Sequence, residues 1–169
     1  MFGRKKDAEK AVSQPPFQLE ILTTEYFIQG TGKGDQQFML PLGTEYWYPT
    51  ELMDVKLTAV GWDDVPVRTV DKFEVKGDAV VAMIPRKDPA GMRQYESYLA
   101  YKNALKGFFY FGPYLFEGTL MSVGNDRFDS VLLMLDTKIR HTSPKSKLGE
   151  ITAPHVLVNT HWMHGWEVK

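Results

Sequence analysis

The sequence has 169 residues, of which 43% are hydrophobic, 13% aromatic and 24% charged, and its net charge is −1. This composition is typical of one ordinary domain or two small ones, and the near-zero charge excludes a general electrostatic attraction to nucleic acid. The sequence has no cysteine, which excludes disulfide bonds, thiolate nucleophiles and cysteine-ligated zinc or iron–sulfur sites.

Residues 1–16 are polar and end in two prolines, so we expect a flexible leader there. Basic residues open this segment, but no apolar stretch follows them. No part of the sequence is apolar over the length that a signal peptide or a membrane span needs. We therefore expect a cytoplasmic protein with no membrane partner.

Residues 17–87 show the pattern of short β-strands. Phe17, Leu19 and Ile21 alternate with polar residues, as on a strand with one buried face. Similar runs follow, separated by turn residues. This spacing favours a small barrel or sandwich over parallel βαβ units, and we predict a first small β-barrel over 17–87.

Residues 88–107 interrupt the β pattern with helical features. Asp88 can cap a helix, and Gly107 suits its C-terminal end. The residues that recur at helical spacing are Met92, Tyr95, Leu99 and Lys102. We predict a helix from about 90 to 105, inside a helical linker over 88–107.

The β pattern returns over 108–169, where we predict a second small β-barrel that repeats the first. Three segments match in the same order: 26–31 with 114–119, 52–57 with 134–139, and 80–83 with 156–159. Two generic hairpins that look alike are the alternative, but the conserved order favours an internal duplication.

Two features recur in the matched segments. Gly30 and Gly118 predict a bend or a close backbone approach in a long strand. Asp54 and Asp136 each stand two residues before a lysine, and this pattern predicts charged side chains outside and cross-strand charge partners.

The second copy carries further motifs between residues 127 and 159. They include an arginine and an aspartate before an apolar strand, an apolar-Asp-x-x-apolar strand, and a closing Val-Asn pair. The residues concerned are Arg127, Asp129 or Ser130, Leu132, Asp136, Val158 and Asn159. With these motifs the segment resembles an uncharacterised bacterial domain family of the Sm-like small-barrel type, although the first copy lacks the Arg-x-x-Asp element.

The resemblance implies a mainly all-β chain of two tandem small Sm-like β-barrels joined by one linker helix. It implies no function, because the family has none that is known and a fold alone does not settle one.

Motifs for catalysis or cofactor binding do not emerge. Residues 30–35 (GTGKGD) lack the spacing of a phosphate-binding loop and do not open a helix. The serines show no nucleophile motif. We therefore predict no enzyme, no catalytic residue, no cofactor and no small-molecule ligand.

The four histidines are His141, His155, His161 and His164. His161 and His164 are three residues apart, which places them on opposite faces of a strand. We predict no metal site.

Two surfaces are candidates for binding. Tyr46, Trp47 and Tyr48 are consecutive aromatics in a loop, which suit a protein interface. The alternative is a loop folded over the barrel as part of the core, and the Trp162 to Trp166 segment has the same ambiguity.

The other surface is a basic run in the second copy: Lys138, Arg140, His141, Lys145 and Lys147. Such a run can hold single-stranded nucleic acid, or it is a solvated basic face, because Asp136 and Glu150 dilute its charge. The sequence thus favours a non-enzymatic interaction or scaffold module that binds a protein partner or itself. Binding of single-stranded RNA or DNA is the alternative.

Overall fold

The computed structural model describes residues 17–32, 50–62, 64–87, 103–122 and 131–169, which form ten β-strands and two short 3₁₀ turns. The elements are β1 (Phe17–Leu22), β2 (Tyr26–Gly32), β3 (Thr50–Ala59), β4 (Arg68–Val75), η1 (Gly77–Ala79), β5 (Ala82–Lys87), β6 (Asn103–Phe111), β7 (Tyr114–Ser122), β8 (Val131–His141), β9 (Ile151–Asn159), η2 (Thr160–Trp162) and β10 (Met163–Val168).

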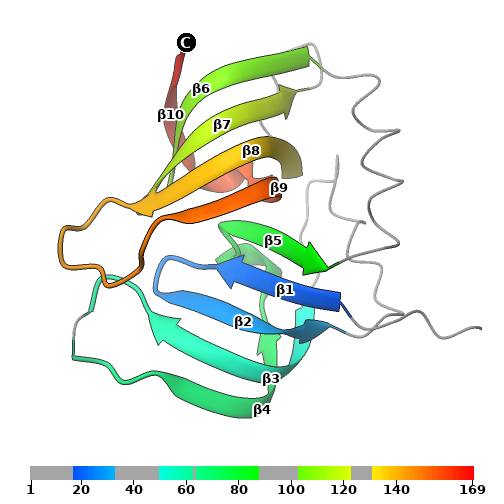
Figure 1. Cartoon of the computed structure of the whole chain (residues 1–169), viewed down its shortest axis with the longest axis vertical. Helices are drawn as coiled ribbons and strands as arrows, with labels where there is room; N and C mark the ends of the chain where they lie inside the picture. The colour runs from blue at the N-terminus through cyan, green and yellow to red at the C-terminus, as the bar shows by residue number, and fades with distance from the viewer. Residues whose placement is uncertain (1–16, 33–49, 63, 88–102, 123–130) are drawn as a thin grey trace, which may run out of the picture.

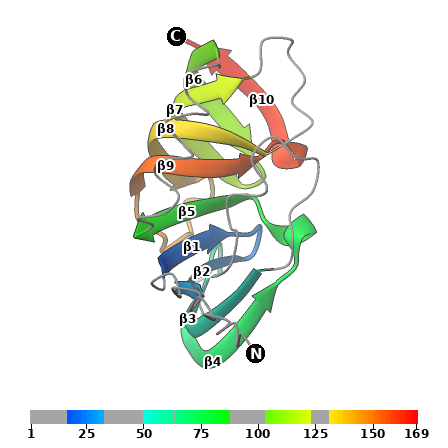
Figure 2. The same ribbon diagram turned by 90° about the vertical axis from the view of Figure 1, so that its right-hand side faces the viewer.

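All ten strands belong to one open antiparallel sheet with the order β10-β6-β7-β8-β9-β5-β1-β2-β3-β4 (Figure 1). Figure 2 shows the same succession from the side. The prediction of a mainly β chain is therefore confirmed. The prediction of two closed barrels is wrong, because β5 pairs with β9 and so joins the two strand sets into one continuous sheet.

The predicted linker helix is wrong where the structure describes it. Asn103 to Leu105 belong to β6, which pairs with β7 along its whole length and so uses the backbone groups that a helix would need. The remainder of that prediction, residues 88–102, lies outside the described residues.

The strand order repeats within the sheet. The first five strands follow the order β5-β1-β2-β3-β4, and the last five follow β10-β6-β7-β8-β9. In each set a 3₁₀ turn, η1 or η2, separates the fourth strand from the fifth. Each strand of one half therefore has an equivalent in the other, at the same place in the order. The predicted match of 80–83 with 156–159 is wrong, because β5 is the fifth strand of its half whereas β9 is the fourth strand of the other half.

Both halves also carry a β-bulge at the same place. In β3 one extra residue is inserted between the pairs that β2 makes at Gln29 and Thr31, and Asp54 has φ 51°. β8 has the same insertion opposite Gly118, and Asp136 has φ 48°. Aspartate is among the few residues that adopt this left-handed conformation readily, so these aspartates shape the bulges.

The glycines opposite the bulges are closely approached by neighbouring atoms. A Cβ on Gly118 would lie 2.8 Å from the carbonyl oxygen of Leu135 and 3.0 Å from Thr137 Oγ1. A Cβ on Gly30 would lie 3.0 Å from Leu52 Cβ and 3.0 Å from Val55 Cγ2. The prediction of a close backbone approach is confirmed at Gly118, whereas at Gly30 the closest atoms belong to side chains.

The junction between the halves is short and apolar. Ala82 faces Val158 and Met83 faces Leu157 across β5 and β9. Asn159 extends the junction, since its backbone amide donates to the Val81 carbonyl at 2.9 Å and its side-chain amide donates to the Val80 carbonyl at 2.9 Å.

Among the residues that the structure describes, the hydrophobic core forms two clusters, and both cross this junction. One fills the second half and takes in Leu22 and Ile84 from the first. The other fills the first half and takes in Leu133 and Leu157, which point away from the second half's own core. The buried Tyr114 hydroxyl also donates to the Thr23 carbonyl at 2.7 Å. The outer face of β8 and β9 thus covers the core of the first half.

Candidate functional site: the two end strands

The sheet ends at β4 and at β10, which lie at opposite ends of the molecule (Figure 1). Within the described ranges, each end strand pairs with another strand on one side only. The other side presents a row of backbone amides and carbonyls that can bind an added strand. The two end strands differ strongly in their side chains.

β10 carries large apolar side chains on its core face. Trp166 lies opposite the fully buried Phe109, and Val168 lies opposite the buried Gly107. Residues opposite each other on paired strands share a face of the sheet, so Trp166 and Val168 continue the core surface of the second half. Yet they are 48% and 57% exposed. The apolar core surface of the second half thus extends to the edge of the sheet, where about half of the Trp166 and Val168 side-chain surface is exposed to solvent.

The position of β10 is fixed by close packing against β6. A Cβ on Gly107 would overlap with the carbonyl oxygen of Glu167 on β10. The backbone amide of Lys169 donates to the Lys106 carbonyl at 2.8 Å. Just before β10, Trp162 is partly buried against the core. Within the Trp162 to Trp166 segment, Trp162 thus packs partly buried against the core, whereas Trp166 is half exposed.

β4 has a charged outer surface. Its exposed residues include Arg68, Asp71, Lys72 and Glu74, and Lys72 forms a 2.6 Å ion pair with Glu51 on β3. Charged side chains on an end strand disfavour indiscriminate pairing with other sheets. Of the two edges, β10 is therefore the one with an apolar surface to bury.

The predicted basic run lies largely on the second half's outer face, among carboxylates. Lys138 and Arg140 are exposed on β8, and Arg140 Nε donates to Glu150 at 2.6 Å. Lys169 forms a 2.6 Å ion pair with Glu117 and holds the pKa of that carboxyl below its usual range, with Lys138 and Arg140 acting in the same direction. The charge of Arg140 is therefore neutralised within the chain, and the carboxylates beside it reduce the positive potential that nucleic acid would require.

The remaining residues of the run do not join Lys138 and Arg140. The His141 ring packs edge-on against Tyr114, with 5.2 Å between ring centroids, and burial lowers the pKa of His141. Lys145 and Lys147 lie in the connection between β8 and β9. The hypothesis of nucleic-acid binding gains no support from this arrangement.

The other predicted surface, Tyr46, Trp47 and Tyr48, lies outside the described residues. From the sequence, the Trp162 to Trp166 segment is a candidate for an interface or for the core, but nothing marks β10 as an end strand. Its signal was present in Trp166 and Val168, which alternate on one strand, but a sequence pattern does not tell an end strand from a central one.

Two hollows lie on the outer face of the sheet, one beside each bulge, with volumes of about 290 Å³ and 170 Å³. They are lined at equivalent positions, with Asp54 and Lys56 in the first half and Asp136 and Lys138 in the second. Each hollow contains one ion pair, Arg86 with Glu20 in the first half and Lys169 with Glu117 in the second.

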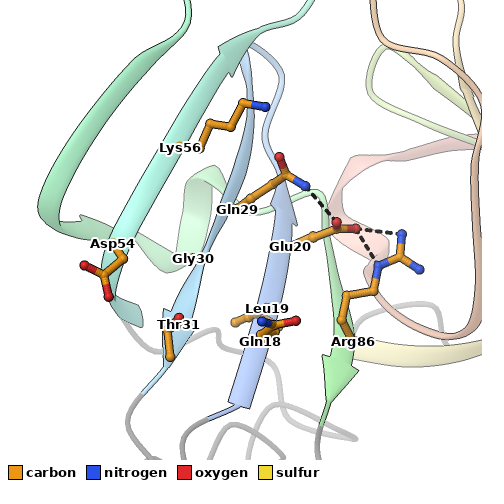
Figure 3. Close-up of a pocket in the computed structure, with 9 residues that line it drawn as sticks. All are labelled: Gln18, Leu19, Glu20, Gln29, Gly30, Thr31, Asp54, Lys56 and Arg86. Atoms are coloured by element: carbon orange, nitrogen blue, oxygen red, sulfur yellow. Dashed lines mark hydrogen bonds and ion pairs between the residues drawn. The ribbon is translucent and has the colours of Figure 1, made fainter.

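In the larger hollow, Glu20 accepts hydrogen bonds from Gln29 at 2.9 Å and from Arg86 at 2.7 Å (Figure 3). Arg86 also donates to the Thr152 carbonyl on β9 at 2.8 Å. This network therefore ties the first half to the second, and it has a structural role in the junction.

Neither a metal cluster nor a membrane-spanning helix is found in the described part of the chain. No group of three or more histidine, aspartate or glutamate side chains there could hold a metal ion. No helix there is long and apolar enough to cross a membrane.

Comparison with protein families, curated proteins and solved structures finds no match to this chain.

Proposed function

We propose that this chain is a non-enzymatic interaction module that binds a protein partner or itself through its end strand β10. The observation that carries the proposal is the half-exposed pair Trp166 and Val168 on the core face of that strand. Strand addition at β10 would bury both side chains and pair the outward backbone groups. Burying one such side chain contributes about 1.5–3 kcal/mol.

We also propose that the two halves are copies of one Sm-like module. The repeated strand order, the 3₁₀ turn before each fifth strand and the bulges at Asp54 and Asp136 support a common origin. A module built on strand pairing already joins to its own copy inside this chain, at β5 and β9. Binding through a sheet edge is thus a property that the fold uses internally.

The test is the mass of the full chain in solution, measured by light scattering over a range of concentrations. We expect the wild type to exceed the mass of one chain and to gain mass as concentration rises. Trp166→Lys should weaken this association by about 30-fold or more, because losing an anchoring tryptophan costs about 2 kcal/mol and a lysine on an end strand opposes pairing.

Trp62→Lys is the matched control. Trp62 is 63% exposed and lies outside the strands, so this variant should associate like the wild type. The proposal would be contradicted by a wild type of one-chain mass at every concentration, or by a folded Trp166→Lys variant that associates as the wild type does.

A further inference from the structure

The internal junction joins two specific members of the repeated strand set. β5 is the fifth strand of the first half, and β9 is the fourth strand of the second half. The two end strands are the complementary members, since β4 is the fourth strand of the first half and β10 is the fifth of the second. The internal junction pairs a fifth strand with a fourth strand. The two ends of the sheet are a fourth strand, β4, and a fifth strand, β10, so they could pair in the same way.

We infer that the partner of β10 is a second copy of this chain, and that β10 of one copy pairs with β4 of the next in the antiparallel register of the β5–β9 junction. This inference rests on the proposed function and names its partner. A head-to-tail contact of this kind produces a ring when its rotation closes and a filament when it does not.

The strand pairs within each half give the register of this contact. Met83 faces Ile21 and Trp166 faces Phe109, at equivalent places of the fifth strands. Because β3 and β8 correspond with an offset of 82 residues, Leu157 (opposite Leu133) is equivalent to Glu74 (opposite Glu51). Since Met83 faces Leu157 inside the chain, Trp166 of one copy would face Glu74 of the next.

The neighbouring positions follow from the same register. Gly165, the equivalent of Ala82, would face Val75, and Val168 would face Lys72, whose ammonium group pairs with Glu51 within the chain. Backbone pairing along both strands thus adds to the burial of Trp166.

One difference from the internal junction sets the strength of the contact. The equivalents of the buried Leu157 and Leu133 are Glu74 and Glu51, so the core of the second half would be covered by a partly charged surface. A contact that buries fewer apolar atoms is weaker. We therefore expect the β10–β4 contact between copies to form reversibly, whereas the β5–β9 junction within each chain stays formed.

The direction of the backbone amides allows each edge to be blocked separately. The Asn159 amide points at β5, and alternate residues of a strand point the same way, so the amides of Leu157 and its equivalent Glu74 point outward. Glu74→Pro therefore removes a donor from the β4 edge without removing one from the β3 ladder. Glu74→Ala, which keeps the amide, is the control.

The experiment combines this variant with Trp166→Lys, which blocks β10. Each variant alone should have the mass of one chain, whereas an equimolar mixture should reach the mass of two chains and no more, because only one intact β4 and one intact β10 edge can meet. Circular dichroism confirms that each variant is folded.

The result that would overturn the inference is a Glu74→Pro variant that associates like the wild type. That result leaves the proposed function standing, since β10 would then bind elsewhere, for example to β10 of another copy. Loss of association in Glu74→Ala as well as in Glu74→Pro would also contradict strand pairing at β4.

A gain-of-association variant tests the same contact without damaging it. Glu74→Leu restores the leucine that Leu157 supplies at the internal junction. We expect it to lower the dissociation constant by tenfold or more, and the gain should vanish in the Trp166→Lys background. An unchanged dissociation constant would count against the register.

Discussion

Leu157→Ala should lower the free energy of unfolding by about 2–5 kcal/mol, the cost of truncating a buried leucine. Leu157 is fully buried, faces Met83 across the β5–β9 junction, and packs in the core of the half to which its own strand does not belong. The cavity would therefore open at the junction, where it weakens both halves together.

Chemical denaturation followed by circular dichroism measures this effect. The variant should unfold in one transition at a lower denaturant concentration, because both core clusters cross the junction. Val67→Ala is the control, since Val67 is 52% exposed and should change stability little. A variant with wild-type stability, or one in which only half of the signal shifts, would contradict a shared core.

Gly118→Ala should destabilise the chain by about 1–3 kcal/mol, the usual cost of forcing an extra methyl group into a packed site. The new Cβ would meet the Leu135 carbonyl oxygen at 2.8 Å and the Thr137 Cα at 3.1 Å. Both are backbone atoms, which cannot rotate away as the end of a side chain can.

Gly149→Ala provides the matched control, because a Cβ at Gly149 meets nothing within 4 Å. Thermal unfolding of the two variants beside the wild type separates the effect of crowding from that of losing a glycine. Equal unfolding midpoints for Gly118→Ala and Gly149→Ala would contradict the crowding at Gly118 opposite the β8 bulge.

Most strands could be predicted from local alternation. The pattern at Phe17, Leu19 and Ile21 corresponds to β1, whose side chains at these positions are buried. The matched segments pointed to a bend or close backbone approach at Gly30 and Gly118, which lie opposite the two bulges. The sequence pattern did not predict the left-handed backbone at Asp54 and Asp136. Their charge suggested only that the side chains face solvent and pair across strands.

The connection of the halves could not be predicted from local pattern. Whether a strand set closes on itself or opens to join another depends on long-range pairing, here Ala82 with Val158 and Met83 with Leu157. These apolar residues look the same in sequence as residues of a closed barrel. The strand start at Asn103 was missed for a similar reason, because its partner Ser122 lies beyond the following turn.

The candidate site depends on the same long-range information. Trp166 and Val168 suit a buried strand by residue type, and only the sheet order shows that β10 is an end strand. Conversely, Lys138 and Arg140 suggested a basic surface, whereas Glu150 pairs with Arg140 and Glu117 lies opposite Lys138 on β7.

Hydrogen exchange of individual backbone amides tests most directly whether the end strands receive partners. The Lys169 amide donates to Lys106 inside the chain and serves as the internal reference; the neighbouring Val168 amide and the Glu74 amide face outward. We expect exchange at Val168 and Glu74 to slow as concentration rises, while exchange at Lys169 stays constant. Rates at Val168 and Glu74 that are independent of concentration would contradict strand addition at the two edges of the sheet.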